Sequence, residues 1–353
     1  MSEMASRRRE VTVSDVAREA GVGKATAARA LGGYGAVSEA VRDRVMAAAE
    51  RLEYRPNELA RSMNTGKSKT IGVIVGDIEN GYFGLAMRGI SDAAKAAGYD
   101  VILINTSENV EAEIDAVRVL LDKRVDGVIV APASSFETDH LHDVHASGRP
   151  MVLLDRHVDG LDVPSVGVDI AVAAQDAAAS LLAAGHRRIA FVTALASDES
   201  WAPGQPLAVS SVTDRLAGIQ AALTASDVEP DTLLVRFGAI GMPAVTAIID
   251  ELLALPQPPT AILASDSVIA LDMLRVLRSR GIELPRDLSF VMFDDFPWTE
   301  LVAPPLSVVS QPIYDVGLAA GRKLVRLLAG ASGEEAELLA ARFIERGSVG
   351  VVG

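Results

Sequence analysis

The sequence predicts a small all-α unit joined to a larger α/β portion that forms two lobes with parallel, doubly wound sheets. Three observations lead to this fold class. Residues 11–55 contain three short helical patterns. From residue 71 onward, short β-branched apolar runs alternate with Ala- and Leu-rich helical patterns, and this alternation continues for about 280 residues, which exceeds one compact core.

The composition is that of a globular protein, with 49% hydrophobic and 23% charged residues in 353. No apolar run reaches the roughly 18 residues that span a bilayer, and the N-terminal MSEMASRRRE lacks the apolar segment of a secretory signal. The absence of cysteine excludes disulfides, thiolate nucleophiles and Cys-ligated zinc. We therefore expect a cytoplasmic protein with no membrane partner.

Charge is distributed unevenly along the chain. Residues 1–70 hold 13 of the 33 Lys and Arg residues but only 9 of the 47 Asp and Glu residues. This segment therefore carries +4 and the remainder −18, which together give the net charge of −14. A basic head on an acidic body indicates that the head meets phosphates and the body does not.

The first helical pattern begins at a cap candidate, Thr12 or Ser14, and ends at Gly21. The second starts at Lys24 after a Gly-Val-Gly turn, and the third, SEAVRDRVMAAAERLEY, closes at Pro56. A helix, a tight glycine turn and a second helix at this spacing predict a helix-turn-helix headpiece.

The boundaries follow from these patterns. The polar stretch NELARSMNTGKSKT predicts a linker with one short helix. We predict a headpiece at 1–56, a linker at 57–70 and an α/β portion at 71–353.

Continuous apolar runs in residues 71–353 predict strands that are buried on both faces. A last strand is expected in the C-terminal tail, and the irregular stretch 194–212 is expected to be an exposed loop. The candidate strands are residues 71–75, 101–105, 127–131, 151–155, 188–193, 232–236, 261–265 and 288–293, and the candidate helices include 86–97, 110–123, 171–184 and 268–280.

Polar residues collect where these strands end, which is where ligands bind in open α/β sheets. Carboxylates accept hydrogen bonds from hydroxyl groups, Arg and Asn donate them, and aromatic rings stack on the C–H face of a sugar. The residue types therefore favour a sugar-like guest. The candidate effector-binding residues are Asn80, Tyr82, Phe83, Asp155, Arg156, Arg215, Asp266, Asp294 and Gln311.

The stretch VTVSDVAREAGVGKATAARAL, with VSEAVRDRVMAAAERLEYRPNELARSMNTGKSKTIGVIV after it, resembles the lactose/galactose repressor family of bacterial transcription regulators. The resemblance implies that the second helix enters the DNA major groove and that a hinge helix places Met63 in the minor groove. The DNA-binding residues that it implies are Thr12, Ser14, Lys24, Ala25, Thr26, Arg29, Asn57, Arg61 and Met63.

The resemblance further implies that residues 71–353 are a sensor with a type I periplasmic-binding-protein fold, with an N-lobe at about 71–168 and 312–330 and a C-lobe at about 169–311 and 331–353. It also implies a homodimer with a hinge at 57–70, and a pseudo-palindromic double-stranded operator whose affinity a sugar-like effector controls. It implies no metal and no cofactor. Two departures leave the guest open between a pentose, a modified sugar, a polyol and a nucleoside: the family's usual Asn-Pro is Asn80-Gly81 here, and its common Asn-Asp is Ser265-Asp266.

Three alternatives remain at this stage. An enzyme on a nucleotide-binding scaffold is opposed by the absence of GxGxxG after a strand, of GxxxxGK[ST] and of HExxH. A sugar-binding protein for transport is opposed by the fused headpiece. A purine- or nucleoside-responsive regulator of the same architecture differs only in the chemistry of its ligand.

Overall fold

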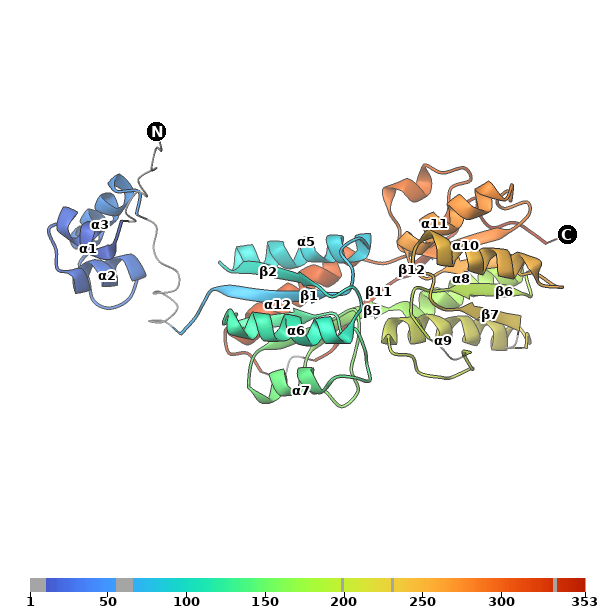
Figure 1. The fold of residues 1–353 in the computed structure, drawn as a ribbon, viewed down its shortest axis with the longest axis horizontal. Helices are drawn as coiled ribbons and strands as arrows, with labels where there is room; N and C mark the ends of the chain where they lie inside the picture. Colours follow the sequence, from blue (N-terminus) through green and yellow to red (C-terminus); the bar gives the residue numbers. More distant parts are fainter. Residues whose placement is uncertain (1–10, 55–65, 198–199, 230–231, 333–334, 353) are drawn as a thin grey trace, which may run out of the picture. The chain divides into compact units, whose positions relative to one another are not determined.

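The computed structural model describes residues 11–54, 66–197, 200–229, 232–332 and 335–352. The chain divides into two compact units, Met1–Lys69 and Thr70–Gly353 (Figure 1), and each is described by itself. Within the described residues, no helix is both long enough and apolar enough to cross a membrane.

The first unit packs three short helices around a core of small apolar residues. The chain turns between the first two helices at Gly21, whose φ of 64° lies in the left-handed region that glycine tolerates. The core residues are Val16, Ala17, Ala20, Ala27, Ala30, Val45, Ala48 and Ala49. The helices are α1 (Val13–Glu19), α2 (Lys24–Gly32) and α3 (Glu39–Arg51), as the sequence patterns predicted.

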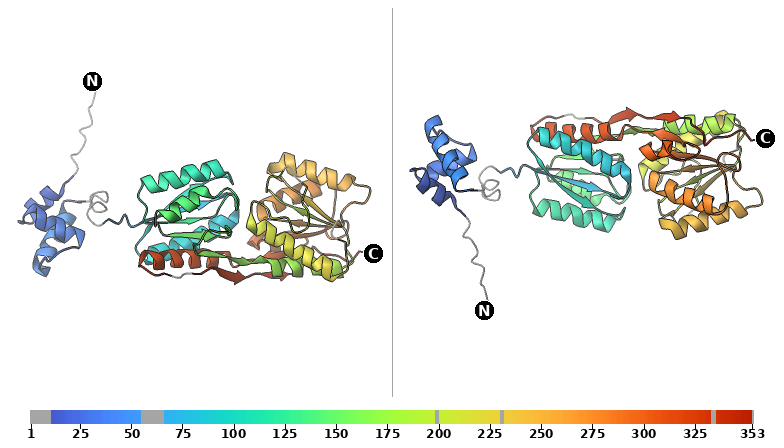
Figure 2. Two further views of the ribbon diagram at one scale, coloured as in Figure 1. Left: turned by 90° about the horizontal axis from the view of Figure 1, so that it is seen from below. Right: turned by 90° about the horizontal axis from the view of Figure 1, so that it is seen from above.

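The first lobe of the second unit is a six-stranded parallel sheet in the order β11-β5-β4-β3-β1-β2. Its strands are β1 (Thr70–Val75), β2 (Asp100–Asn105), β3 (Gly127–Val130), β4 (Met151–Leu154), β5 (Ser165–Asp169) and β11 (Glu337–Ala340). Helices α5 (Gly81–Ala96) and α12 (Ile313–Leu328) cover one face, and α6 (Val110–Asp122) and α7 (Asp139–Ala146) cover the other (Figure 2).

The second lobe repeats this plan with the order β12-β10-β9-β8-β6-β7, in which only β12 runs antiparallel. Its strands are β6 (Ile189–Val192), β7 (Leu233–Arg236), β8 (Ala261–Ala264), β9 (Ser289–Phe293), β10 (Ser307–Ser310) and β12 (Arg342–Ile344). Its helices are α8 (Ile170–Ala183), α9 (Ser210–Ala225), α10 (Gly241–Ala254), α11 (Ser267–Ser279) and the 3-10 turn η2 (Pro297–Glu300).

The chain crosses between the lobes three times: from β5 to α8, from β10 to α12 and from β11 to β12. The predicted C-lobe segment 331–353 is therefore wrong in part, because β11 lies in the first lobe, where its Glu337–Ala340 pairs with β5. Strands β5 and β10 were also absent from the predicted set. They are only four or five residues long and carry Ser, Gly or Asp, so their apolar runs are too short to stand out from loops.

Glycine allows the closest helix packing in the first lobe. A Cβ placed on Gly317 of α12 would lie 1.9 Å from the carbonyl oxygen of Ala86 on α5. That contact is with backbone, which cannot move aside as a side chain can. The α5–α12 pair therefore depends on a hydrogen at this position, and α12 directly follows one of the three crossings.

We expect Gly317→Ala to destabilise the protein by about 1–3 kcal/mol, because the added methyl group overpacks the helix interface. The matched control is Gly84→Ala on α5, an exposed position with no atom within 4 Å of the added Cβ. There alanine favours the helix by up to about 1 kcal/mol. Urea denaturation followed by circular dichroism measures both variants, and equal or higher stability of Gly317→Ala would contradict this packing.

Candidate functional site

Helix α2 presents one polar face and buries the other. Ala27 and Ala30 are buried in the headpiece core, whereas Lys24, Ala25 and Arg29 are exposed within that unit. The Arg29 Nε donates a hydrogen bond to the Ala25 carbonyl oxygen at 3.2 Å, so its side chain lies back along the helix surface. The predicted second-helix contacts therefore share one exposed surface, with Thr26 half-buried beside them.

The remaining predicted headpiece contacts fall at the start of α1 and in the hinge. Thr12 precedes α1, and both its backbone N–H and its hydroxyl group donate to Asp15 Oδ2, at 3.0 and 2.7 Å. Ser14 is half-buried in the first turn of α1. The residues that the resemblance assigned to the hinge lie outside the described residues: Asn57, Arg61 and Met63.

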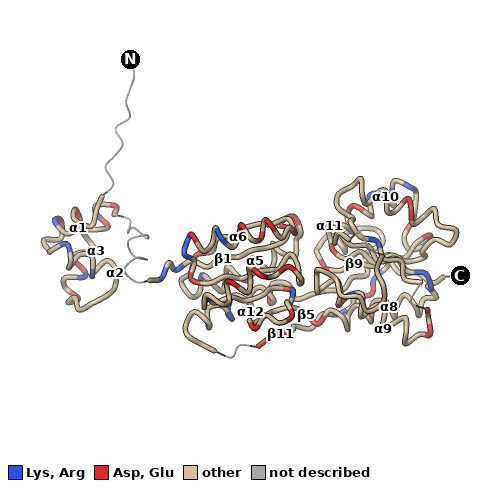
Figure 3. The backbone as a smooth tube through the Cα atoms, turned by 60° about the horizontal axis from the view of Figure 1, so that its bottom comes forward, with Lys and Arg blue, Asp and Glu red and all other residues tan. Residues whose placement is uncertain are grey.

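The basic surplus of the head is not carried by its three helices. Residues 11–54 contain six basic and six acidic residues, and Figure 3 shows both signs on this unit. The surplus of four positive charges in residues 1–70 thus comes from segments 1–10 and 55–70. Within the helical unit, the local arrangement of charge on α2 matters more than its total.

Polar side chains from both lobes meet at the facing ends of the two sheets. Tyr82 from α5 and Asp155 after β4 belong to the first lobe, and Arg215 of α9 and Asp294 after β9 belong to the second. Burial is the largest cause that raises the pKa of Tyr82, and Asp155 is the next. Asp294 also raises this pKa, and Arg215 lowers it. The structure therefore brings together four residues that the sequence placed separately. We refer to Tyr82, Asp155, Arg156, Arg215, Asp294 and Gln311 as the inter-lobe cluster.

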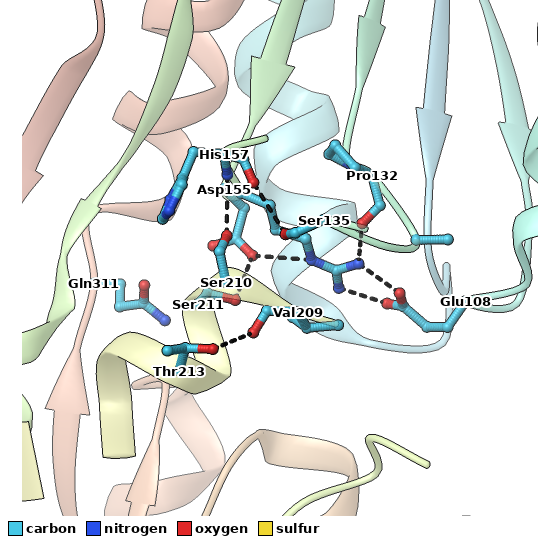
Figure 4. A network of polar contacts seen from close by, with 12 residues as sticks. Glu108, Pro132, Ser135, Asp155, His157, Val209, Ser210, Ser211, Thr213 and Gln311 are labelled. Carbon is cyan, nitrogen blue, oxygen red and sulfur yellow. Dashed lines mark hydrogen bonds and ion pairs between the residues drawn. The ribbon is translucent and has the colours of Figure 1, made fainter. Parts of the chain in front are cut away.

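Arg156 is held by groups of its own lobe. Its terminal nitrogens pair with both carboxylate oxygens of Glu108 at 2.6 and 2.7 Å, and one of them also donates to the Pro132 carbonyl oxygen at 2.6 Å. Its Nε lies 3.7 Å from Asp155 Oδ2, on the other side of the guanidinium (Figure 4). Phe83 lies beneath the guanidinium, 5.9 Å from ring centre to Cζ. Arg156 therefore organises the site around Asp155.

Arg215 lies over the ring of Phe293, with its Cζ 4.9 Å from the ring centre. Three side-chain atoms of the inter-lobe cluster are buried and make no hydrogen bond of normal geometry within the described residues, although Asp155 lies beside the first two of them. These are the Tyr82 hydroxyl oxygen, Arg156 Nε and Arg215 Nε. Buried polar groups in folded proteins are normally satisfied, so these atoms have the hydrogen-bonding capacity to receive a polar guest.

Asp294 is the most buried carboxylate of the cluster, with a relative exposure of 1%. Its backbone adopts a left-handed φ of 74°, and its Oδ1 accepts a hydrogen bond from Gln311 Nε2 at 2.6 Å. Burial raises the pKa of Asp294 to about 7, although Arg215 and the Gln311 hydrogen bond oppose that shift. The predicted pair of Asp294 and Gln311 is thus in direct contact.

Two of the predicted site residues also cap helices. The Asn80 side-chain oxygen accepts from the Tyr82 N–H at the start of α5. Asp266 Oδ1 accepts from two backbone N–H groups at the start of α11, and its Oδ2 accepts from the Ser265 hydroxyl group. These residues orient the elements that border the cluster, and Asp266 also adds negative charge beside Arg215 and Asp294.

Sequence reasoning missed the groups that bridge the lobes and line the cluster. The Ser211 hydroxyl group donates to Asp155 Oδ2 at 3.2 Å, the His157 N–H donates to Ser210 Oγ at 3.0 Å, and Figure 4 shows these residues together. Glu108 was also missed. It is 48 residues from Arg156 in the chain, and no local pattern links the two.

The structure explains why residue 81 is glycine, which the sequence alone does not. A Cβ placed on Gly81 at the start of α5 would lie 2.8 Å from the ring of Phe296, which follows β9 in the other lobe. Phe296 therefore covers α5 where a larger residue would not fit.

No group of three or more His, Cys, Asp or Glu residues in the described part of the chain is arranged to hold a metal ion. The histidines of α7 do not form such a group. His140 Nε2 shares a hydrogen bond of 2.6 Å with the buried carboxylate of Glu113 on α6. Glu113 also accepts from the Ala133 N–H at 2.7 Å, so this pair supports the loop after β3.

The raised pKa of Asp294 predicts a pH-dependent contribution to stability. The folded state holds this proton up to about pH 7, whereas the unfolded chain releases it near 3.8. Between these values the folded state binds more protons, so the contribution of Asp294 to the free energy of unfolding falls as the pH rises and is constant above that window. We expect Asp294→Asn to gain stability relative to the wild type across it.

Melting temperatures measured by circular dichroism at successive pH values test this expectation. Asp176→Asn on α8 makes the same substitution at an exposed position and is the control. A difference between wild type and Asp294→Asn that stays constant from pH 4 to pH 7 would show that this carboxyl group titrates normally.

Comparisons with known proteins agree with this architecture. Residues 12–57 match the family model described as bacterial regulatory proteins, lacI family, and residues 68–344 match periplasmic binding proteins and sugar binding domain of LacI family. The chain is 33% identical to Catabolite control protein A of Priestia megaterium over 318 residues, which are 90% of this chain and 92% of that protein.

The solved structures that are similar to it include two that contain a bound small molecule. One is a LacI family transcriptional regulator from Enterococcus faecium with bound ribose, with a TM-score of 0.68, 28% identity and coverage of 80% of this chain and 100% of that one. The other is the lac repressor dimer bound to operator and the anti-inducer ONPF, with a TM-score of 0.77, 26% identity and coverage of 96% and 99%. The helical headpiece, the two doubly wound lobes and these matches together show that the chain belongs to the LacI family of bacterial regulatory proteins.

Proposed function

We propose that this chain is a sequence-specific DNA-binding transcription regulator, a repressor, whose operator affinity is controlled by a small sugar-like effector bound between the two lobes. The observation that carries the proposal is the inter-lobe cluster. Both lobes contribute charged side chains to it, and three of its buried polar atoms make no hydrogen bond of normal geometry within the described residues. A hydroxyl-rich guest would satisfy these atoms and join the lobes.

The headpiece binds the operator through α2. Lys24 and Arg29 are exposed donors of the kind that reads guanine O6 and N7, and the Ala25 methyl group can contact a thymine methyl group. Thr12, Ser14 and Thr26 lie near the phosphate backbone in this arrangement. The hinge contacts, Asn57 and Arg61 on phosphates and Met63 as the minor-groove wedge, rest on the family resemblance alone.

The effector binds at the inter-lobe cluster. Asp155 and Asp294 accept hydrogen bonds from its hydroxyl groups, while Arg215, Gln311 and the Tyr82 hydroxyl group supply donors. Asn80, Arg156 and Asp266 border these groups, and Phe83 supports Arg156 from below. The ribose bound in the similar Enterococcus faecium regulator supports a sugar-sized guest here.

Coupling between the two sites follows from linkage. A guest that contacts both lobes stabilises the arrangement in which Asp155 and Asp294 are close, and it therefore favours one conformation of the three crossings. If the hinge adopts different structures in the two lobe arrangements, the guest changes the affinity for the operator. The change is at most the ratio of the guest's affinities for the two arrangements. The chain thus acts by binding, without turnover, in the cytoplasm, where the operator lies.

A homodimer fits an operator with two-fold symmetry. Strand β2 lies at the edge of its sheet, and the exposed apolar side chains Leu85, Leu103 and Ile78 are on or beside this strand and α5. The Ile78 N–H donates to the Asn105 side chain at the end of β2, which places it beside that edge. An edge strand with apolar side chains is a surface suited to a second copy of the chain, and the similar lac repressor is a dimer on its operator.

The full-length chain should select a pseudo-palindromic duplex from a random-sequence library at about 50 mM salt, with affinity falling steeply as salt is added. Lys24→Ala and Arg29→Ala should each weaken binding to that duplex by about 1–3 kcal/mol, because each removes a base-edge donor. Arg118→Ala, an exposed position on α6 in the sensor, is the control. Failure to enrich any duplex would exclude the operator-binding role.

A thermal-shift panel of pentoses, hexoses, polyols and nucleosides should contain a guest that stabilises the protein, by roughly 2.7 kcal/mol at 100 times its dissociation constant. Arg215→Gln should abolish this shift, because it removes the unsatisfied donor. Arg275→Gln on the exposed face of α11 should not. A panel in which every compound leaves the wild-type melting temperature unchanged would reject a sugar-like effector.

A further inference from the structure

The guanidinium of Arg156 is already occupied by an acidic side chain of the same lobe. Glu108, in the loop between β2 and α6, engages both terminal nitrogens of Arg156 with its two carboxylate oxygens. Paired donors and acceptors of this kind are among the stronger hydrogen-bonded ion pairs in proteins. One of these nitrogens also donates to the Pro132 carbonyl oxygen. The Glu108 carboxylate therefore largely neutralises the positive charge of Arg156 before any guest arrives.

The backbone is built to hold Glu108 in this place. Its φ of 58° is left-handed, and its N–H donates to the Gly76 carbonyl oxygen at 3.1 Å, just beyond β1. A Cβ on Gly76 would lie 2.0 Å from Glu108 Oε1. The absence of a side chain at position 76 therefore makes room for the carboxylate to reach across the end of β1 to Arg156.

Neutralising Arg156 leaves an excess of negative charge around the guest. Asp155, Asp266 and Asp294 lie in the cluster or at its border, and Arg215 is the one cation among the described residues there that has no carboxylate hydrogen-bonded to it. A phosphate or carboxylate on the guest would lose its hydration and would find only the Arg215 guanidinium unpaired, beside three carboxyl groups, because Glu108 already occupies the guanidinium of Arg156. Desolvating a charge without such a partner costs far more than desolvating a hydroxyl group.

We propose that Glu108 is a specificity-determining residue: by occupying Arg156, it makes the inter-lobe site select an uncharged polyhydroxylated guest and reject its phosphorylated or carboxylated counterpart. This selection rests on the proposed effector site between the lobes. Glu108 makes binding of the anionic guest unfavourable, and the site therefore discriminates between two guests of nearly the same shape.

The test uses matched pairs of compounds with the full-length chain: D-ribose and ribose 5-phosphate, D-glucose and glucose 6-phosphate, D-galactose and D-galacturonate, and adenosine and its 5'-monophosphate. Thermal shift finds the pair that binds, and calorimetric titration measures both members. We expect the neutral member to bind the wild type and its anionic partner to bind at least about tenfold more weakly.

Three variants test whether that discrimination depends on Glu108. Glu108→Gln should reduce the ratio of the two dissociation constants by about tenfold, because the terminal nitrogens of Arg156 then have no carboxylate paired with them. Gly76→Ala should reduce the ratio in the same direction by displacing the carboxylate without changing any charge. Glu108→Asp retains the negative charge and should retain part of the discrimination. Glu111→Gln, an exposed position in the first turn of α6, is the matched control.

The outcomes separate this inference from the effector site itself. Wild-type protein that binds the anionic member of a pair as tightly as the neutral one overturns the role of Glu108 and leaves the effector site standing. Equal weakening of both members in Glu108→Gln and Gly76→Ala also overturns it, because Glu108 would then only support the fold. If no member of any pair binds the wild type, both the sugar-like effector and this inference fail.

Discussion

Buried charge at the facing ends of two sheets is the constraint on which the rest of this structure depends. Asp155, Arg215 and Asp294 are held away from water by a fold that gives them few partners among the described residues. Burial of an ionised group is costly unless it is paired, and the raised pKa of Asp294 is one expression of that cost. A guest that supplies hydrogen bonds removes part of it, so binding and the closure of the lobes are linked.

The same constraint explains why the surrounding frame is rigid and closely packed. The close approach of α5 and α12 holds the helix that carries Tyr82 and Phe83 against the helix that follows Gln311. Caps at Asn80 and Asp266 set the directions of α5 and α11. These supports determine the positions of the polar groups, and the three crossings between the lobes are the segments through which a change at the cluster can reach the rest of the sensor.

The two arginines of the cluster have different roles because they have different partners. Arg156 has its terminal nitrogens bound by Glu108 and Pro132 of its own lobe, so it contributes position and one directed Nε–H group. Arg215 lies on the Phe293 ring with its Nε unsatisfied, so it contributes free donors and positive charge. Two residues of one type in one site thus have different chemistry, and that difference sets which guests the site accepts.

By itself, the sequence determined the three headpiece helices, the alternation of strands and helices, the family, and the polar residues at the strand ends, because glycine turns, caps and apolar periodicity act over a few neighbouring residues. Only the tertiary structure decided the allocation of β11 to the first lobe, since its short run Glu337–Ala340 is defined by pairing with β5. The same holds for the Glu108–Arg156 pair and for Gly81 beneath Phe296. These contacts join residues far apart in the chain, and their geometry depends on how the sheets and helices pack.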